Sequence, residues 1–249
     1  MGFLDSIFGG DKPTPQNIQK LVVRVKERYA QPEYRREAMD TLLNWSTPES
    51  LLAVCQRFTV VAQSPHWDEE EKRWLVDELA ERGAEARSAL LLFVQREDNV
   101  AFAVKALRAI VGADEFVTDL VLALAGRSPV DHRNVQGKQE LVAALGETAD
   151  ARAFTAILPH LSDHSDDVQC CAVDALVKLW PQAAAAHDQG IAGLLVMITD
   201  DARSARVQRH AAGAVEKLGL PIDAARALAP SVAEDFVVKA GKLAHAHAG

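Results

Sequence analysis

The sequence has little of what marks several large classes of protein. Its 249 residues include only three cysteines, Cys55, Cys170 and Cys171, and so small and odd a number predicts no disulfide framework and suits a reducing cytosol. No run of 18 apolar residues occurs, so we predict no membrane-spanning helix. The first eight residues lack the basic region and the long apolar run of a secretory signal. We therefore expect a cytoplasmic protein.

Positive charge is also scarce. Lys and Arg together number 27 against 35 Asp and Glu, which gives a formal net charge of −8. This balance argues against broad binding to the phosphate backbone of nucleic acids, which needs many clustered basic side chains. Residues 1 to 36 differ from the rest, because they carry a net charge of +3 and leave −11 for the remainder.

Strand patterns are missing as well. The 10 prolines and 14 glycines lie between helical patterns and not within stretches of alternating apolar residues, so no β-sheet is predicted. With 49% hydrophobic residues the chain is long enough for one sizeable core. We predict a single all-α domain.

What the sequence does contain is a repeated helix. The segment VQCCAVDALVKL at Val168–Leu179 recurs as VQRHAAGAVEKL at Val207–Leu218. In both copies apolar residues fall at steps of three and four, the single stripe that an α-helix buries against a neighbour. Weaker copies of this frame centre on Leu42, Leu79, Leu107 and Val142, and successive copies are 28 to 39 residues apart. Such periods are typical of solenoids.

A second apolar helix is predicted after each copy, so the repeating unit is a pair of helices. These second helices are expected at residues 48–58, 88–95, 115–125, 151–161 and 189–199. Thr14-Pro15 and Thr47-Pro48 each predict an N-cap followed by proline at the first helical position.

The repeating unit, with its Asp turn, Val, Ala-x-x-Ala-Leu core and closing Leu, resembles the HEAT repeat of the armadillo-like superfamily. The resemblance covers residues 33 to 220 and is most specific at Asp167–Leu179 and Val207–Leu218. It implies a right-handed α-α superhelix, a HEAT-like solenoid of about six helix pairs, with the second helices lining the concave side. We place this helical-repeat domain at residues 15–249, after an apolar segment and linker at residues 1–14.

Motifs that would indicate catalysis are not found. The sequence contains no Gly-rich phosphate loop, nucleophile elbow or Cys-x-x-Cys pair, and no histidine is followed by Glu as in the HEAT-like deoxyhypusine hydroxylases. His160 and His164 lie near Asp163 and its neighbours, but helix capping explains the aspartates and both histidines are expected at a junction open to water. We predict no metal site and no cofactor, and we expect His245 and His247 in a frayed tail.

These observations favour a non-enzymatic scaffold or adaptor that binds a protein or peptide on the solenoid surface. Candidate partner-binding residues are Gln56, Arg57, Arg87, Gln95, Arg152 and Trp67. Trp67 is expected in a loop, where it either staples the helix entry or presents its ring to a partner. The alternative is a HEAT-like enzyme, bilin-lyase-like or nucleic-acid-modifying, in which polar side chains of the second helices would converge on a substrate.

The N-terminus leaves two further possibilities open. An apolar face formed by Phe3, Leu4, Ile7 and Phe8 precedes a basic amphipathic helix that carries Lys20, Arg24 and Lys26. The segment either caps the open end of the first repeat, which we favour, or docks on a partner or an anionic membrane surface. The oligomeric state is left open by the sequence.

Overall fold

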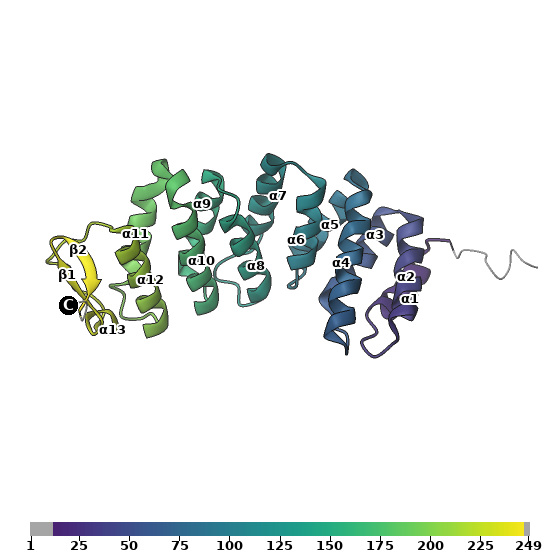
Figure 1. Cartoon of the computed structure of the whole chain (residues 1–249), viewed down its shortest axis with the longest axis horizontal. Helices are drawn as coiled ribbons and strands as arrows, with labels where there is room; N and C mark the ends of the chain where they lie inside the picture. The colour runs from purple at the N-terminus through teal and green to yellow at the C-terminus, as the bar shows by residue number, and fades with distance from the viewer. Residues whose placement is uncertain (1–11, 247–249) are drawn as a thin grey trace, which may run out of the picture. The chain divides into compact units, whose positions relative to one another are not determined.

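The computed structural model describes residues 12–246, and Figure 1 shows the course of its helices. The chain divides into two compact units, of which the first ends at Phe116 and the second begins at Val117. Helices dominate both units, as predicted. None of the described helices is long and apolar enough to cross a membrane.

The first unit is built from helices. Its elements are α1 (Pro15–Val25), α2 (Pro32–Trp45), α3 (Pro48–Val54), the 3-10 turn η1 (Cys55–Thr59), α4 (Pro65–Glu81), α5 (Ala84–Arg96), α6 (Ala101–Ile110) and the first residues of α7 (Ala113–Ala125). The helix α2 packs against α1 and α3, whereas α4 packs against α6 and α5 packs against α3 and α6. The anchors of the sequence repeat, Leu42, Leu79 and Leu107, are fully buried in this packing.

The starts of these helices follow from local sequence. Thr14 and Thr47 have extended backbones, and the side-chain oxygen of each accepts a hydrogen bond from an amide in the first turn of the following helix. At Thr47 the Ser50 side chain also accepts from the Thr47 amide, which completes a capping box. Proline occupies the first helical position after both residues, so the predicted helix starts are confirmed.

The second unit is also largely helical and ends in two short strands. Its elements are the rest of α7, then α8 (Val135–Gly146), α9 (Ala151–Ile157), the 3-10 turns η2 (Leu158–Ser162), η3 (Trp180–Gln182) and η4 (Ala184–Ala186), α10 (Asp166–Leu179), α11 (His187–Met197), α12 (Ala205–Leu218), α13 (Pro230–Ala233), β1 (Phe236–Lys239) and β2 (Lys242–His245). The helix α10 packs against α8, α9 and α12. The two best copies of the repeat, α10 and α12, are therefore neighbours in space.

The predicted stripe on α10 and α12 is largely buried, although Leu218 at its end is only half-buried. Val168, Leu176, Val207 and Val215 are at most 1% exposed. Cys171 and His210, which share one position of the frame, are only half-buried. The repeat frame predicts this position in the core, and that prediction is corrected: Cys171 Sγ lies 3.5 Å from the Gln139 carbonyl of α8, and His210 bonds to Asp174 of α10 at 2.9 Å.

A β-hairpin in the second unit corrects the prediction that the chain has no sheet. Strands β1 and β2 pair antiparallel, with Phe236 opposite His245. The turn residues Ala240 and Gly241 both have positive φ, the combination that a two-residue hairpin turn requires. His245 is therefore part of a strand and not of a frayed tail, and its amide donates to Glu216 Oε1 at 2.9 Å. His247 lies outside the described residues.

Candidate functional site

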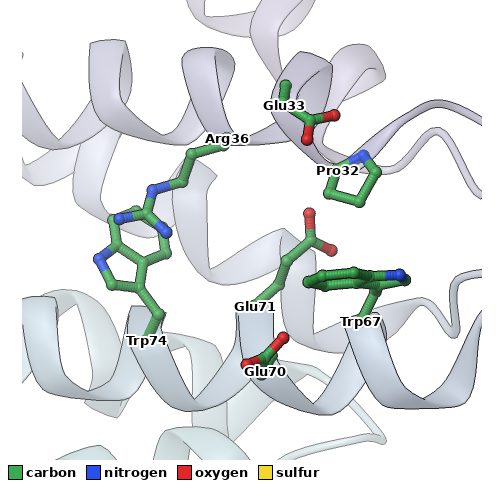
Figure 2. Close-up of a pocket in the computed structure, with 7 residues that line it drawn as sticks. All are labelled: Pro32, Glu33, Arg36, Trp67, Glu70, Glu71 and Trp74. Carbon is green, nitrogen blue, oxygen red and sulfur yellow. The ribbon is translucent and has the colours of Figure 1, made fainter.

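A groove between α2 and α4 is the clearest candidate for a binding site in the first unit. Its volume is about 340 Å³, which is the size of a small ligand pocket. The residues that line it are Pro32, Glu33 and Arg36 from α2, and Trp67, Glu70, Glu71 and Trp74 from α4. Figure 2 shows the two indoles at opposite ends of the groove. We call this feature the Trp67 groove.

One indole of the groove already carries a cation from the chain itself. The Arg36 guanidinium carbon lies 3.1 Å from the centre of the Trp74 ring, a close cation–π stack that Figure 2 shows at one end of the groove. Arg36 Nε is also 3.4 Å from Asp40 Oδ1, and Trp74 Nε1 donates to Glu78 at 3.0 Å. Trp74 is thereby held in place by partners on two helices.

The other indole, Trp67, is open to solvent. It lies in the first turn of α4, so the prediction that it belongs to a loop is wrong by a few residues, because Pro65 starts the helix two residues earlier. Trp67 is 50% exposed although tryptophan is usually well buried. Trp67 and Trp74 are seven residues apart, two turns of a helix, and therefore lie on one face of α4.

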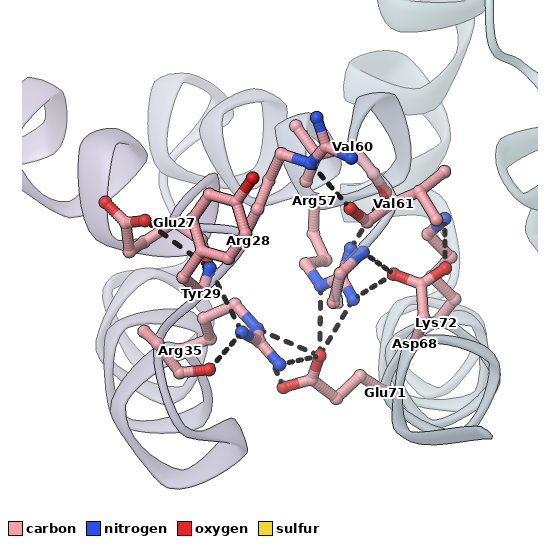
Figure 3. Close-up of polar contacts among 12 residues, drawn as sticks. Glu27, Arg28, Tyr29, Arg35, Arg57, Val60, Val61, Asp68, Glu71 and Lys72 are labelled. Atoms are coloured by element: carbon pink, nitrogen blue, oxygen red, sulfur yellow. Dashed lines mark hydrogen bonds and ion pairs between the residues drawn. The ribbon is translucent and has the colours of Figure 1, made fainter. Parts of the chain in front are cut away.

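Beneath the groove lies a cluster of buried charges, drawn in Figure 3. We call Arg35, Arg57, Asp68, Glu71 and Lys72 the buried ionic cluster, because all five are less than 10% exposed. Glu71, which also lines the groove, pairs with Arg35 Nη2 at 3.0 Å and with Arg57 Nη2 at 2.8 Å. A carboxylate at the base of the groove is thus neutralised from within the protein.

Asp68 is the second carboxylate of the buried ionic cluster. Its oxygens accept from Arg57 Nη2 at 2.6 Å, from Lys72 Nζ at 2.8 Å and from the Ala62 amide at 2.8 Å. Burial opposes ionisation, but the hydrogen bonds from Lys72, Ala62 and Arg57 outweigh it and hold the pKa of Asp68 below its ordinary value. Asp68 is consequently ionised in the folded protein at neutral pH.

The cluster also fixes the two loops that border the groove. Arg35 Nη1 donates to the carbonyls of Glu27 and Ala30 in the α1–α2 loop, at 3.1 and 2.6 Å. Arg57 Nη1 donates to the Val60 carbonyl in the loop before α4, at 3.1 Å. Figure 3 shows both guanidinium groups reaching outward from Glu71 to these loops. The loops are held in place by buried charges that lie below them.

Direct contacts join the two loops to each other. Arg28 Nε donates to the Val61 carbonyl at 2.9 Å, and the Gln63 amide donates to the Arg28 carbonyl at 3.1 Å. A second hollow of about 180 Å³ lies between the loops and shares Pro32 and Trp67 with the Trp67 groove. Tyr29, which also lines this hollow, is 73% exposed. Tyr29 and Trp67 are therefore exposed aromatic side chains beside loops that hydrogen bonds hold together.

The residues predicted to bind a partner are dispersed, and one of them is buried. Trp67 lines the groove, whereas Arg57 is 0% exposed, so the expectation of a surface role for Arg57 is corrected. Gln56 Nε2 bonds to Glu97 at 2.9 Å, and Arg87 pairs with Glu115 at 3.1 Å. Gln95 is exposed near the end of α5. In the second unit, Arg152 pairs with Asp150 at 2.8 Å.

Two of the three basic residues predicted to dock, Arg24 and Lys26, have partners within the first unit. Arg24 pairs with Glu37 at 2.7 Å and lies over the Tyr34 ring, and Lys26 donates to Gln56 at 3.3 Å. Lys20 is exposed. The apolar residues Phe3, Leu4, Ile7 and Phe8 lie outside the described residues, so capping and docking by this segment both stay predictions.

The second unit has a smaller group of buried charges. Lys138 Nζ lies 2.8 Å from both carboxylate oxygens of Asp163, and His160 Nδ1 lies 3.1 Å from Oδ2. All three side chains are buried, which corrects the expectation that His160 is open to water. Desolvation lowers the pKa of His160, although Asp163 partly offsets this effect. His164 is exposed as expected.

Neither the cysteines nor the carboxylates suggest a reactive centre. Burial raises the pKa of the Cys171 thiol to about 11, and it also raises the pKa values of Cys55 and Cys170. Such thiols are poor nucleophiles at neutral pH. Among residues 12–246 no group of three or more His, Cys, Asp or Glu side chains is arranged to hold a metal ion.

Comparisons of the chain with protein-family models, with curated proteins and with solved structures find no match. The site must therefore be interpreted from its own geometry. Two indoles and several carboxylates around a groove of this size are suited to recognition of a side chain or small cation.

Proposed function

We propose that this chain is a HEAT-like helical-repeat adaptor that binds a protein or peptide, and that the Trp67 groove is its binding site. The observation that carries the proposal is the exposed Trp67 indole on a surface fixed by the buried ionic cluster. Tryptophan, tyrosine and arginine dominate the binding energy of known protein interfaces. Trp67, Tyr29 and Arg28 stand together around the two connected hollows.

The rigidity of the loops supports the same proposal. A binding surface that is ordered before the partner arrives loses less conformational entropy on binding, so its contacts yield more affinity. Arg35 and Arg57 hold the loops through backbone carbonyls, which leaves the side chains of Tyr29 and Trp67 available at the surface. The pairing of helices and the repeat frame support a solenoid of about six helix pairs as the scaffold.

A pull-down from cells of the source organism, followed by quantitative mass spectrometry, tests the proposal. We expect at least one protein to be captured by the wild-type chain and to be lost with Trp67→Ala. Val130→Ser serves as the control, because Val130 is 77% exposed and lies in the second unit. Capture that is equal with both variants would contradict the proposed site. A chain that captures no protein, but whose melting temperature rises with a small molecule or a nucleic acid, would favour the enzyme alternative.

A further inference from the structure

We propose that the Trp67 groove binds a lysine or arginine side chain of the partner, with its cation against the Trp67 indole and within reach of Glu33 and Glu70. The inference rests on the proposed function and specifies the chemistry of the partner. The proposed function alone does not say whether the ligand of the groove is basic, apolar or acidic, and the inference selects a basic one.

The chain itself shows how this groove accommodates a cation. Arg36 places its guanidinium 3.1 Å from the centre of the Trp74 ring, at one end of the groove. Trp67 stands at the other end and has half of its surface exposed (Figure 2). Indole faces attract guanidinium and ammonium groups more strongly than other aromatic rings do. Both ends of the groove thus present an indole. Arg36 covers the indole of Trp74, whereas that of Trp67 is open to a cation from a partner.

The charges around the groove favour a cation over an anion. Glu71 is balanced by Arg35 and Arg57, and Arg36 is near Asp40. The Glu33 side chain, in contrast, is exposed and forms no hydrogen bond or ion pair with any residue of 12–246. Figure 2 shows its carboxylate on the α2 side of the groove.

Glu70 adds a second negative charge on the α4 side. Its ion-pair partner is the exposed His66, whose Nε2 lies 3.7 Å from Glu70 Oε2 and which carries a charge only when protonated. Glu33 and Glu70 therefore line the groove with two carboxylates that pair with no Lys or Arg side chain of residues 12–246, whereas the groove's own cation, Arg36, is stacked on Trp74. An acidic ligand would be repelled there, whereas a basic side chain would gain both the indole face and the carboxylates.

A peptide-display selection on the full chain tests the inference. We expect the peptides selected by the wild-type chain to be enriched in Lys or Arg. For the best peptide, replacing its anchoring Arg with citrulline, a neutral side chain of nearly equal shape, should weaken binding about tenfold. A peptide anchored by Lys would be compared with its norleucine analogue in the same way.

Charge variants of the protein provide the matched control. The double variant Glu33→Gln/Glu70→Gln should weaken the same peptide about tenfold and reduce the salt dependence of binding. Glu49→Gln/Glu81→Gln removes the same formal charge from exposed positions of the first unit outside the groove, and it should leave affinity within about twofold. Trp67→Tyr should retain more binding than Trp67→Ala, provided that the melting temperatures of both match the wild type.

The outcomes separate the two proposals. Peptides that need Trp67 but contain no basic anchor, or that bind Glu33→Gln/Glu70→Gln normally, would overturn the cationic-ligand inference and leave the binding site standing. Peptides that bind Trp67→Ala as well as wild type, or a selection that yields no Trp67-dependent peptide, would overturn both.

Discussion

Both units of this protein bury charged side chains, but these charges reach different parts of the molecule. In the second unit Lys138, Asp163 and His160 form a small group in which Asp163 also accepts from the Ser165 amide at the start of α10. In the first unit Arg35 and Arg57 pass from buried carboxylates to the carbonyls of two surface loops. Lys138 also donates to the Asp131 carbonyl in the loop before α8, at 2.9 Å. The buried charges of the second unit thus hold a helix junction and one loop, whereas those of the first unit hold the two loops beside the Trp67 groove.

The exposed apolar side chains of the two units also differ. The exposed large apolar side chains of the second unit are aliphatic, namely Leu122, Val130 and Val196. Those above the buried ionic cluster include Tyr29 and Trp67. Since aromatic anchors on an ordered surface are typical of binding sites, the comparison supports our proposal that the binding site lies in the first unit.

The largest effect is expected from breaking the buried ionic cluster. Arg57→Met would leave Asp68 and Glu71 with fewer partners in a buried setting and should lower the free energy of unfolding of the first unit by about 4 kcal/mol. Hydrogen exchange with mass spectrometry would measure this loss in each unit separately. Arg73→Met is the control, because the Arg73–Glu69 pair is exposed and should contribute at most about 0.5 kcal/mol. Equal effects of the two variants would refute the importance of the cluster.

A somewhat smaller effect is expected from the corresponding change in the second unit. Lys138→Met should lower the free energy of unfolding there by about 3 kcal/mol, less than Arg57→Met, because Lys138 bonds to the single carboxylate of Asp163 whereas Arg57 bonds to those of both Asp68 and Glu71. The same exchange experiment measures it. Loss of protection in α2 and α4, and not in α8 and α10, would contradict this assignment.

The third prediction concerns the stability of the two units in mild acid. The pKa of His160 is lowered in the folded state, so the unfolded chain binds the proton more readily. The stability of the second unit therefore falls as the pH drops below the ordinary histidine value of about 6.5, by up to about 1 kcal/mol between pH 7.5 and 5.5. His160→Asn should flatten this dependence.

The stability of the first unit should change little between pH 7.5 and 5.5. The pKa of Asp68 is lowered, so its contribution is present above the ordinary aspartate value of about 3.9 and is lost only as the pH falls below it. Stability measured between pH 7.5 and 3 by exchange or by urea unfolding would show the order. Loss of the first unit before the second would contradict the prediction.

The smallest effect on stability is expected at Trp67. Because half of its side chain is already in water, Trp67→Ala should cost less than about 1 kcal/mol. Trp180→Ala should cost more, since that ring packs against Phe154 and stacks on His187. Thermal unfolding of both variants tests the difference. A severe loss with Trp67→Ala would mean that this ring serves folding and not binding.

The repeat frame made part of the fold predictable from the sequence. Val168, Leu176, Val207 and Val215 follow the helical period, and all are buried. The frame fades toward the N-terminus because charged residues replace apolar ones there. Glu71 lies four residues before Leu75, and Asp68 lies three residues before Glu71, so both carboxylates continue the buried stripe of Leu75 and Leu79.

Buried charges such as Asp68 and Glu71 cannot be predicted by a method that expects every charged residue at the surface. The run Asp68-Glu69-Glu70-Glu71-Lys72 suggests a solvated helix start, and only its helical spacing with Leu75 reveals which members face inward. Their partners Arg35 and Arg57 come from other helices, so no local signal identifies them. The hairpin at Phe236–His245 was missed because four-residue strands give too short an alternation to recognise.

Fluorine NMR of the chain labelled with 5-fluorotryptophan tests the central claim most directly, because only four tryptophans are present and they occur in both units. Each signal would be assigned by a Trp→Phe variant, and the best basic peptide from the display selection would then be added. The account predicts that the Trp67 signal shifts on binding, followed by that of Trp74, while the Trp180 signal stays in place. A shift of Trp180 with Trp67 unchanged would place the binding site in the second unit and contradict the account.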